Sequence, residues 1–182
     1  PRLRALLDEA MMLAAVGRQG DAKLATDRAR DTFEDLGQRR WLEISKAAHA
    51  EIARREGKLE RAEELLRSVY DFFRTQGDEN NSLQIAFVLA DVLCDLGRFD
   101  EADLLATLVA RQGPPDDIEV QVSWRAVRSR TSVARGDPTG AVTLAEEAVS
   151  IANTTSFVLL QAEAARALFG DRQPAIPVER GE

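Results

Sequence analysis

The stretch GRFDEADLLA, residues 97–106, contains the pattern that decides the fold. A glycine is followed by an aromatic residue two positions later and by an alanine five positions later, with acidic residues between them. Glycine often closes the last turn of a helix because it adopts positive φ, and acidic side chains favour the first turn of the next helix. The stretch therefore predicts a corner between two helices. The question is whether this corner occurs once or repeats.

The same glycine-to-alanine spacing occurs five times along the chain. It is found in GRQGDA (17–22), GKLERA (57–62), GRFDEA (97–102), GDPTGA (136–141) and GDRQPA (170–175). The glycines stand at 17, 57, 97, 136 and 170, so most units are close in length. Apolar residues recur at three- and four-residue steps before the first four glycines, as in LQIAFVLADVLCDL, which is typical of an amphipathic helix. A regular pitch of this size indicates a stacked array of helical hairpins.

The predicted fold class is all-α, a right-handed superhelical array of antiparallel hairpins. We expect helices at residues 2–16, 20–36, 39–56, 59–76, 80–96, 99–112, 117–135, 139–153 and 156–169. They form one domain, residues 1–170, with units at 3–42, 43–82, 83–121 and 122–155 and a partial unit at 156–175. The remaining segment, 171–182, has two prolines and no periodic pattern, so we expect an irregular tail.

The composition excludes several classes of partner. The chain is 45% hydrophobic and 30% charged, with a net charge of −7, which disfavours nucleic acid and anionic membrane surfaces. The apolar run Ala10 to Val16 is too short to span a bilayer. A single cysteine, Cys94, cannot form an internal disulfide, so we expect a cytoplasmic protein. The chain begins at Pro1 rather than methionine, and we expect a fragment of something larger.

The repeated corner resembles the tetratricopeptide repeat. The shared features are the glycine, the position two residues later, filled by Phe99 and Leu59, and the alanine five residues after the glycine. The units here are longer than the ordinary pitch of about 34 residues. The tryptophan–leucine–glycine pattern of the first helix is absent, although Ala10, Ala50 and Ala90 occupy its small-residue position.

A second resemblance covers nearly the whole chain. The runs FEDLGQRRW, LADVLCDLGRFDEADLLA and PPDDIEVQVSWRAVRSRTSVARGD are similar to the C-terminal helical-repeat region of large bacterial signalling proteins. In that group a class III nucleotide cyclase domain, an ATP-binding regulatory module, or both precede the repeats, and related repeats occur in ATP-dependent transcription regulators. The resemblance implies a regulatory or docking segment, and no cyclase or ATPase motif is present in this sequence.

We predict no catalytic, metal or cofactor-binding residues, and no enzyme activity. His49 is the only histidine, and neither it nor Cys94 belongs to a spacing pattern typical of metal ligands. Gly-rich phosphate loops are missing. The paired acids Glu63–Glu64 and Glu146–Glu147 are expected on solvated helix faces.

The candidate binding residues lie on the expected inner wall of the array. Counting six residues back from successive corner glycines gives aligned positions on the first helix of each unit, and two more candidates lie one turn away. The set is Met11, Glu51, Arg54, Phe87, Asp91 and Arg130. Its mixed charges and apolar groups would suit a protein or peptide ligand, or are simply an ordinary charged helix surface. Alternatives are self-association into a homo-oligomer through the C-terminal helix and, less favoured, sensing of a small molecule.

The segment SWRAVRSR raises a further choice. Trp124 and Arg128 are four residues apart, so we expect them to stack on one helix face. The alternative is an anion-binding strip formed by Arg125, Arg128 and Arg130, whose spacing does not place all three on one face.

Overall fold

The computed structural model describes residues 2–169, in which helices are joined by short turns and no strand occurs. The helices are α1 (Arg2–Ala15), α2 (Gln19–Asp35), α3 (Arg39–Arg55), α4 (Leu59–Thr75), α5 (Glu79–Asp95), α6 (Phe99–Gln112), α7 (Ile118–Ala134), α8 (Pro138–Ala152) and α9 (Val158–Phe169). The all-α prediction is confirmed, and the predicted helix ends differ from the observed ones by at most two residues. The expected tail, 171–182, and the last expected corner, 170–175, lie outside the described residues.

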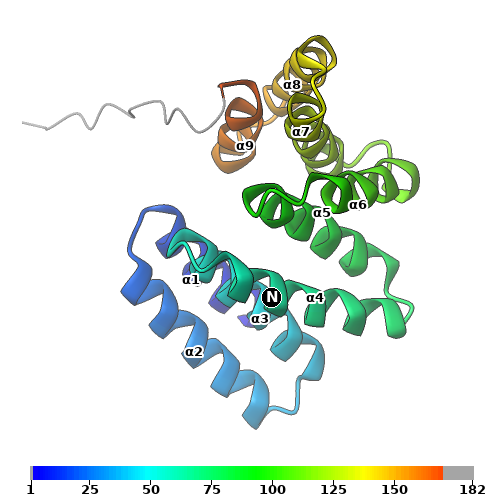
Figure 1. Cartoon of the computed structure of the whole chain (residues 1–182). Coiled ribbons are helices and arrows are strands. Elements are labelled where there is room, and N and C mark those ends of the chain that lie inside the picture. Colours follow the sequence, from blue (N-terminus) through cyan, green and yellow to red (C-terminus); the bar gives the residue numbers. More distant parts are fainter. Residues whose placement is uncertain (1, 170–182) are drawn as a thin grey trace, which may run out of the picture.

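The helices are arranged as a solenoid of hairpins. Each helix packs against the next one in the chain, and the odd-numbered helices also contact one another, α1 with α3, α5 with α7 and α7 with α9. Figure 1 shows the array running from the α1–α2 hairpin at one end to α8 and α9 at the other. Within the described part of the chain, no helix is both long and apolar enough to cross a bilayer.

Each of the first five turns between helices contains a glycine with positive φ. At the corner between α3 and α4, the Gly57 amide donates to the Arg54 carbonyl oxygen (2.9 Å) and the Lys58 amide donates to the Ala53 carbonyl oxygen (2.8 Å). This closure satisfies carbonyls that the helix end leaves free. The glycines of these turns follow one another every twenty residues: Gly17, Gly37, Gly57, Gly77 and Gly97. Both kinds of corner, within and between hairpins, therefore use the same turn.

The regular spacing ends after α6. Gly113 has extended backbone (φ −71°, ψ 146°) and is followed by Pro114 and Pro115. α7 then starts from Asp117, whose side-chain oxygen accepts a hydrogen bond from the Val120 amide (3.1 Å). A Cβ atom at Gly113 would lie 2.3 Å from Cγ1 of Val120, so a larger residue does not fit without movement.

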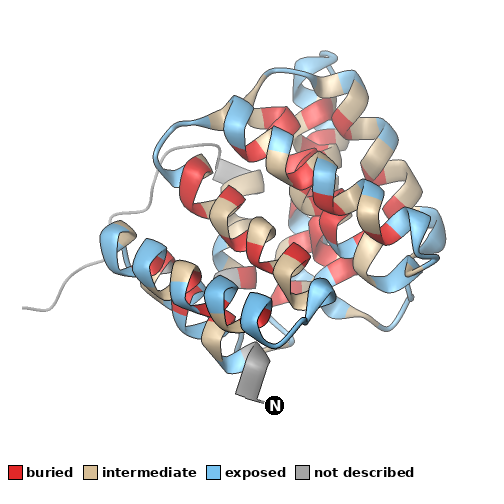
Figure 2. Cartoon of the chain, turned by 90° about the horizontal axis from the view of Figure 1, so that it is seen from below, coloured by how far each residue is buried: buried red, intermediate tan, exposed pale blue. Residues whose placement is uncertain are grey.

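The core lies between the helices and is centred on α5. This helix is buried on nearly every side, as expected for a helix that is apolar all round. Figure 2 shows buried residues along the faces that the helices turn toward one another. In the part of the chain that the structure describes, the alanines five residues after the corner glycines are buried, as expected where two helix backbones approach closely: Ala22, Ala62, Ala102 and Ala141.

Two glycine substitutions test separately the need for positive φ in the turn and the low helix propensity of glycine. Gly57→Ala should lower the free energy of unfolding by about 1 kcal/mol, because Gly57 has φ +75° and an L-residue is strained there. Gly20→Ala, inside α2 with open space around its Cβ position, should raise it by about 0.5 kcal/mol. Urea denaturation measures both, and a stabilising Gly57→Ala would contradict the role of the turn.

Candidate functional site: the inner cluster

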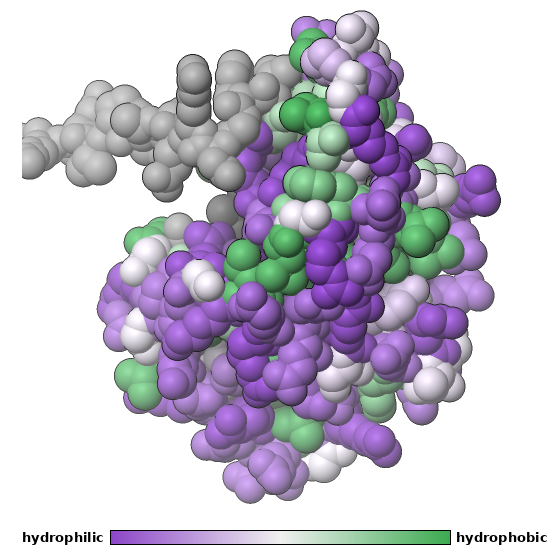
Figure 3. All heavy atoms as spheres, viewed as in Figure 1, coloured by the Kyte–Doolittle hydropathy of each residue, from purple (hydrophilic) through white to green (hydrophobic). Residues whose placement is uncertain are grey.

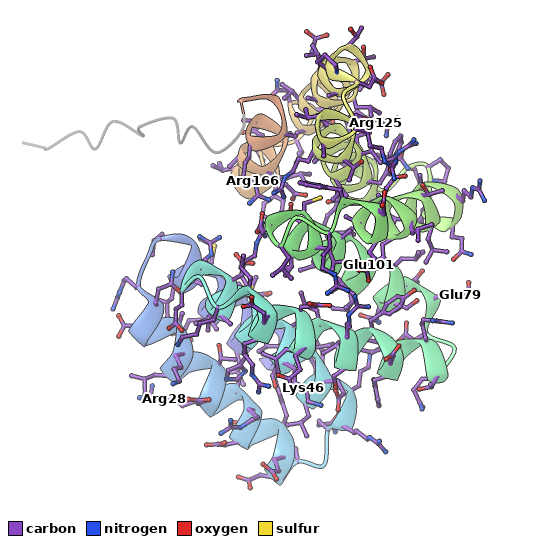
Figure 4. The ribbon with its side chains drawn as sticks, viewed as in Figure 1. Arg28, Lys46, Glu79, Glu101, Arg125 and Arg166 are labelled. Carbon is purple, nitrogen blue, oxygen red and sulfur yellow. The ribbon has the colours of Figure 1, made fainter. Side chains whose placement is uncertain are left out.

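Five charged side chains from four helices converge on the inner side of the array. We call them the inner cluster: Arg54 of α3, Asp91 and Asp95 of α5, Arg130 of α7 and Arg166 of α9. Three of these helices, α3, α5 and α7, are the first helices of their hairpins, and α9 follows the last described hairpin, so the cluster joins successive units. Figure 4 labels Arg166, which reaches from α9 toward α5.

Asp91 is the centre of the inner cluster. One of its carboxylate oxygens lies 2.5 Å from Nη2 of Arg54 and also pairs with Arg166, and the other lies 2.5 Å from Nη1 of Arg130. Arg54 and Arg130 also pair with Asp95. Its carboxylate lies 2.6 Å from Nε of Arg54 and 2.6 Å from Nη2 of Arg130. Two aspartates of one helix are thus held by arginines from both neighbouring inner helices.

The local sequence explains this geometry. Asp91 and Asp95 are four residues apart, so they lie on the same face of α5. α3 and α5 approach each other less closely than the other consecutive inner helices do. The long side chain of Arg54 spans this wider seam, where a small residue could not reach α5. Charged contacts thus supplement apolar packing at this point of the array.

The inner cluster stabilises its own charges. Burial by itself would raise the pKa of Asp91, but Arg54, Arg166 and Arg130 more than offset this and hold the pKa at about 2. Burial likewise disfavours the charged form of Arg54, yet Asp91 and Asp95 raise its pKa above the usual value. Asp91 is only 8% exposed. It is therefore a carboxylate at neutral pH, surrounded by arginines rather than by water.

The six predicted binding residues separate into three groups. Arg54, Asp91 and Arg130 belong to the inner cluster. Glu51 borders it, 3.8 Å from Arg54, and is paired mainly with Arg55, whose Nε lies 2.7 Å from its carboxylate. The two others, Met11 and Phe87, are considered separately because neither takes part in these ion pairs.

Met11 and Phe87 differ sharply in exposure. Met11 is 40% exposed on α1, so it can contact a ligand. Phe87 is 7% exposed and packs in a core cluster with Leu83, Val109 and Val120. The side chain of Phe87 therefore lies on the core side of α5 and offers little surface to a partner.

Sequence reasoning missed two charged residues of α9, Glu163 and Arg166. Both lie in the otherwise uncharged helix VLLQAEAARALF, one helical turn apart, and this isolated pair is the signal that could have revealed them. Burial and the nearby Asp91 raise the pKa of Glu163 to about 7. Arg166 closes the inner cluster from the side of α9.

Other candidate chemistry is accounted for by packing. Cys94 is buried, and burial raises the pKa of its thiol to about 12, so the thiol is protonated. The ring of His49 contacts the Ser45 carbonyl oxygen (2.9 Å) and a carboxylate oxygen of Asp27 (3.0 Å). Among residues 2–169, no group of three or more histidine, cysteine and acidic side chains is arranged to hold a metal ion.

Trp124 stacks with a different arginine from the one expected. The guanidinium carbon of Arg125 lies 4.1 Å from the centre of the Trp124 ring. Arg128 instead lies 3.4 Å from Asp103 of α6. The prediction of a Trp124–Arg128 pair is therefore wrong, because an acid on the neighbouring helix attracts Arg128. Arg130 belongs to the inner cluster, so the three arginines do not form one anion-binding strip.

Comparison with known proteins supports the fold and leaves the partner open. No protein-family model matches the sequence, and no curated protein matches it. A solved structure from Podosopora anserina, described as a putative kinesin light chain with nearly identical TPR-like repeats, matches with a TM-score of 0.61 and 23% sequence identity. The match covers 91% of this chain and 85% of that chain. The chain thus has a TPR-like helical-repeat fold.

Asp91→Asn should destabilise the fold at neutral pH by about 3 kcal/mol, because buried arginines lose their shared counter-charge. Asp91 has its pKa lowered from 3.8 to about 2, so its stabilisation is present above pH 4 and is lost as the pH falls toward 2. The difference between wild type and Asp91→Asn should therefore shrink over that interval. Denaturant titrations at several pH values measure it.

The matched control is Asp100→Asn, since Asp100 is 93% exposed and pairs with Arg135 at the surface. Its effect should stay within about 0.5 kcal/mol at every pH. Equal effects of the two substitutions would mean that the inner cluster contributes no more than a surface ion pair.

Proposed function

We propose that this chain is a non-catalytic protein-interaction module whose inner helices bind a peptide or helix of a partner. The observation that carries the proposal is the inner cluster, in which side chains 35 and 39 residues apart, such as Arg130 with Asp95 and Asp91, lie in direct contact. The inner helices of consecutive hairpins therefore lie side by side, which is what a repeat array needs to recognise an extended ligand. Proteins with TPR-like repeats generally bind other proteins.

The chemistry of the ligand follows from what the inner side leaves accessible. The central charges neutralise one another, so the groups most available to a partner lie toward the N-terminal end. Met11 is 40% exposed, the Arg55 side chain is 38% exposed, and Glu51 is paired with Arg55 and only partly exposed. A ligand with an apolar anchor and flanking charges fits this set. The visible face in Figure 3 is mainly hydrophilic, with apolar residues in separate patches, which favours recognition by a few anchors over a broad apolar interface.

A peptide selected by the purified chain from a phage-displayed random library provides the probe. Glu51→Lys and Met11→Asp should each weaken its binding about tenfold or more, because one reverses a charge and the other removes an apolar anchor. Isothermal titration calorimetry measures the affinity, and thermal melts confirm that each variant is folded.

Matched controls are Met12→Asp and Glu64→Lys, which change exposed residues that take no part in the inner cluster. Both should bind the peptide as wild type does. If the control substitutions weaken peptide binding and the substitutions of Met11 and Glu51 do not, the binding site does not lie on the inner side.

The proposal extends to the setting of the module. The resemblance to repeats of bacterial signalling and transcription-regulating proteins supports a role as the regulatory segment of a larger cytoplasmic protein. An antibody against these residues should then detect a band in source cells well above the 20.1 kDa of this chain. A native band near that mass would instead mean a free-standing adaptor.

Self-association through α9 is the competing function. Light scattering over a range of concentrations distinguishes the two functions. A module that binds a peptide on its inner helices should remain monomeric without that peptide. A concentration-dependent dimer that Glu51→Lys leaves intact would favour the competing function.

A further inference from the structure

A second hollow lies on the side of α3 that faces away from the inner cluster. α2 and α4 both pack on α3 but hardly touch each other, so they leave a groove between them. This outer groove has a volume of about 440 Å³, within the range of about 300–1,000 Å³ typical of binding clefts. Figure 4 labels Lys46 of α3, which lies between α2 and α4 in that view and lines the outer groove.

The sequence of α3 separates the two sides of the array. Leu42, Lys46 and His49 line the outer groove and follow one another at steps of four and three residues, so they share one face of the helix. Glu51 and Arg54 fall on the opposite face, because 3.6 residues complete one helical turn. A ligand of the outer groove therefore uses a different surface from a ligand of the inner side.

The lining of the outer groove is basic, although the whole chain is acidic. The chain has 24 basic and 31 acidic residues and a net charge of −7. Among the described residues that line the outer groove, the acids are Glu34 and Glu56. The basic side chains outnumber them and come from all three helices: Lys23, Arg30, Lys46, Lys58 and Arg61. The lining thus has the opposite charge to the chain as a whole, which favours an acidic ligand.

The acids that now pair with Arg30 and Arg61 lie outside the groove. Arg61 pairs with Glu64 (2.5 Å), whose side chain is 68% exposed. Arg30 pairs with Asp31 (3.0 Å), which is 66% exposed, and with Asp27 (3.3 Å). Exposed ion pairs contribute little because water competes for both charges. A ligand carboxylate that approaches from inside the groove can therefore replace these acids.

The floor of the outer groove is apolar. Leu42 of α3 and Leu65 of α4 line it and are partly buried, and Ile52 lines it as a buried residue. An apolar side chain of a peptide is removed from water on such a floor, whereas a free phosphate gains nothing from it. The combination of basic walls and an apolar floor therefore favours a peptide over a simple anion.

We propose that the outer groove binds an acidic segment of a partner protein. An apolar side chain of this segment packs on Leu42 and Leu65. Its carboxylates pair with Lys23, Arg30 and Arg61 along the two walls. Because the inner side stays accessible, one chain can then hold two different partners at once.

A phage-displayed library of random peptides tests the proposal on the full chain. The library is first depleted on the double variant Arg30→Glu/Arg61→Glu and then selected on the wild-type chain. The selected peptides should be rich in aspartate and glutamate and should contain an apolar residue. A synthetic peptide of the selected sequence should bind the double variant at least about tenfold more weakly than wild type, because two attractive charges become repulsive. Isothermal titration calorimetry measures both affinities.

The matched control is the double variant Arg28→Glu/Arg74→Glu. It changes the net charge by the same amount at exposed residues of the same two helices, outside the outer groove, and Figure 4 labels Arg28. This control should bind the peptide as wild type does, and so should Glu51→Lys on the inner side. If Arg30→Glu/Arg61→Glu lowers the melting temperature, the neutral pair Arg30→Gln/Arg61→Gln replaces it and should still weaken binding about threefold.

The proposal is wrong if the depleted library yields no acidic peptides, or if the control double variant weakens binding as much as the groove variant does. Weaker binding in Glu51→Lys would place the peptide on the inner side and leave the outer groove without a ligand. Displacement of the peptide by an equal concentration of inorganic tripolyphosphate would show that charge alone is recognised, which also contradicts the proposal.

Discussion

The structure depends on one constraint, the position of the left-handed glycine that ends a helix. From α2 to α5 every helix has 17 residues, because glycines with positive φ recur every twenty residues and each closes the helix before it. Helices of equal length, reversed by identical turns, present their apolar faces at the same height. The buried alanines at the crossings then allow the backbones to approach, and α5 is enclosed by its neighbours. Where the turn changes, at Gly113 and the two prolines after it, the spacing changes as well.

The inner cluster adds a different kind of stabilisation to this framework. Apolar packing between neighbouring helices is only weakly specific for one partner helix. Asp91 instead forms ion pairs with particular arginines of α3, α7 and α9. Ion pairs of this kind contribute little when solvated but are costly to break singly when buried. Arg54, Asp91 and Arg130 were predicted from the sequence to bind a ligand. In the structure they also hold successive hairpins in their relative orientation. A partner must bind beside the cluster or compete with it.

Most of the fold was predictable because its signals are local. The corner glycines and three- to four-residue periodicity placed all the described helices, although Gly37 and Gly77 were overlooked because they lack the alanine five residues later. The site was less predictable. Counting from the glycines aligned Asp91 with Arg130 correctly, but it could not show that Phe87 faces the core or that Arg166 reaches past α7. Side-chain choices between competing partners, such as that of Arg128 for Asp103, depend on the tertiary structure.

The ion pair between Asp91 and Arg166 has a consequence for cooperativity. In an ideal solenoid each unit touches only its neighbours, and unfolding can begin at either end and proceed unit by unit. Here a residue of α9 is tied to α5, 75 positions earlier in the chain. Among residues 2–169, the helices from α5 to α9 therefore form a closed ring of contacts, while α1 and α2 join the rest of the array mainly through their neighbour α3. The two ends of the molecule differ in kind, because the N-terminal hairpin can fray by itself and the C-terminal half unfolds largely as one unit.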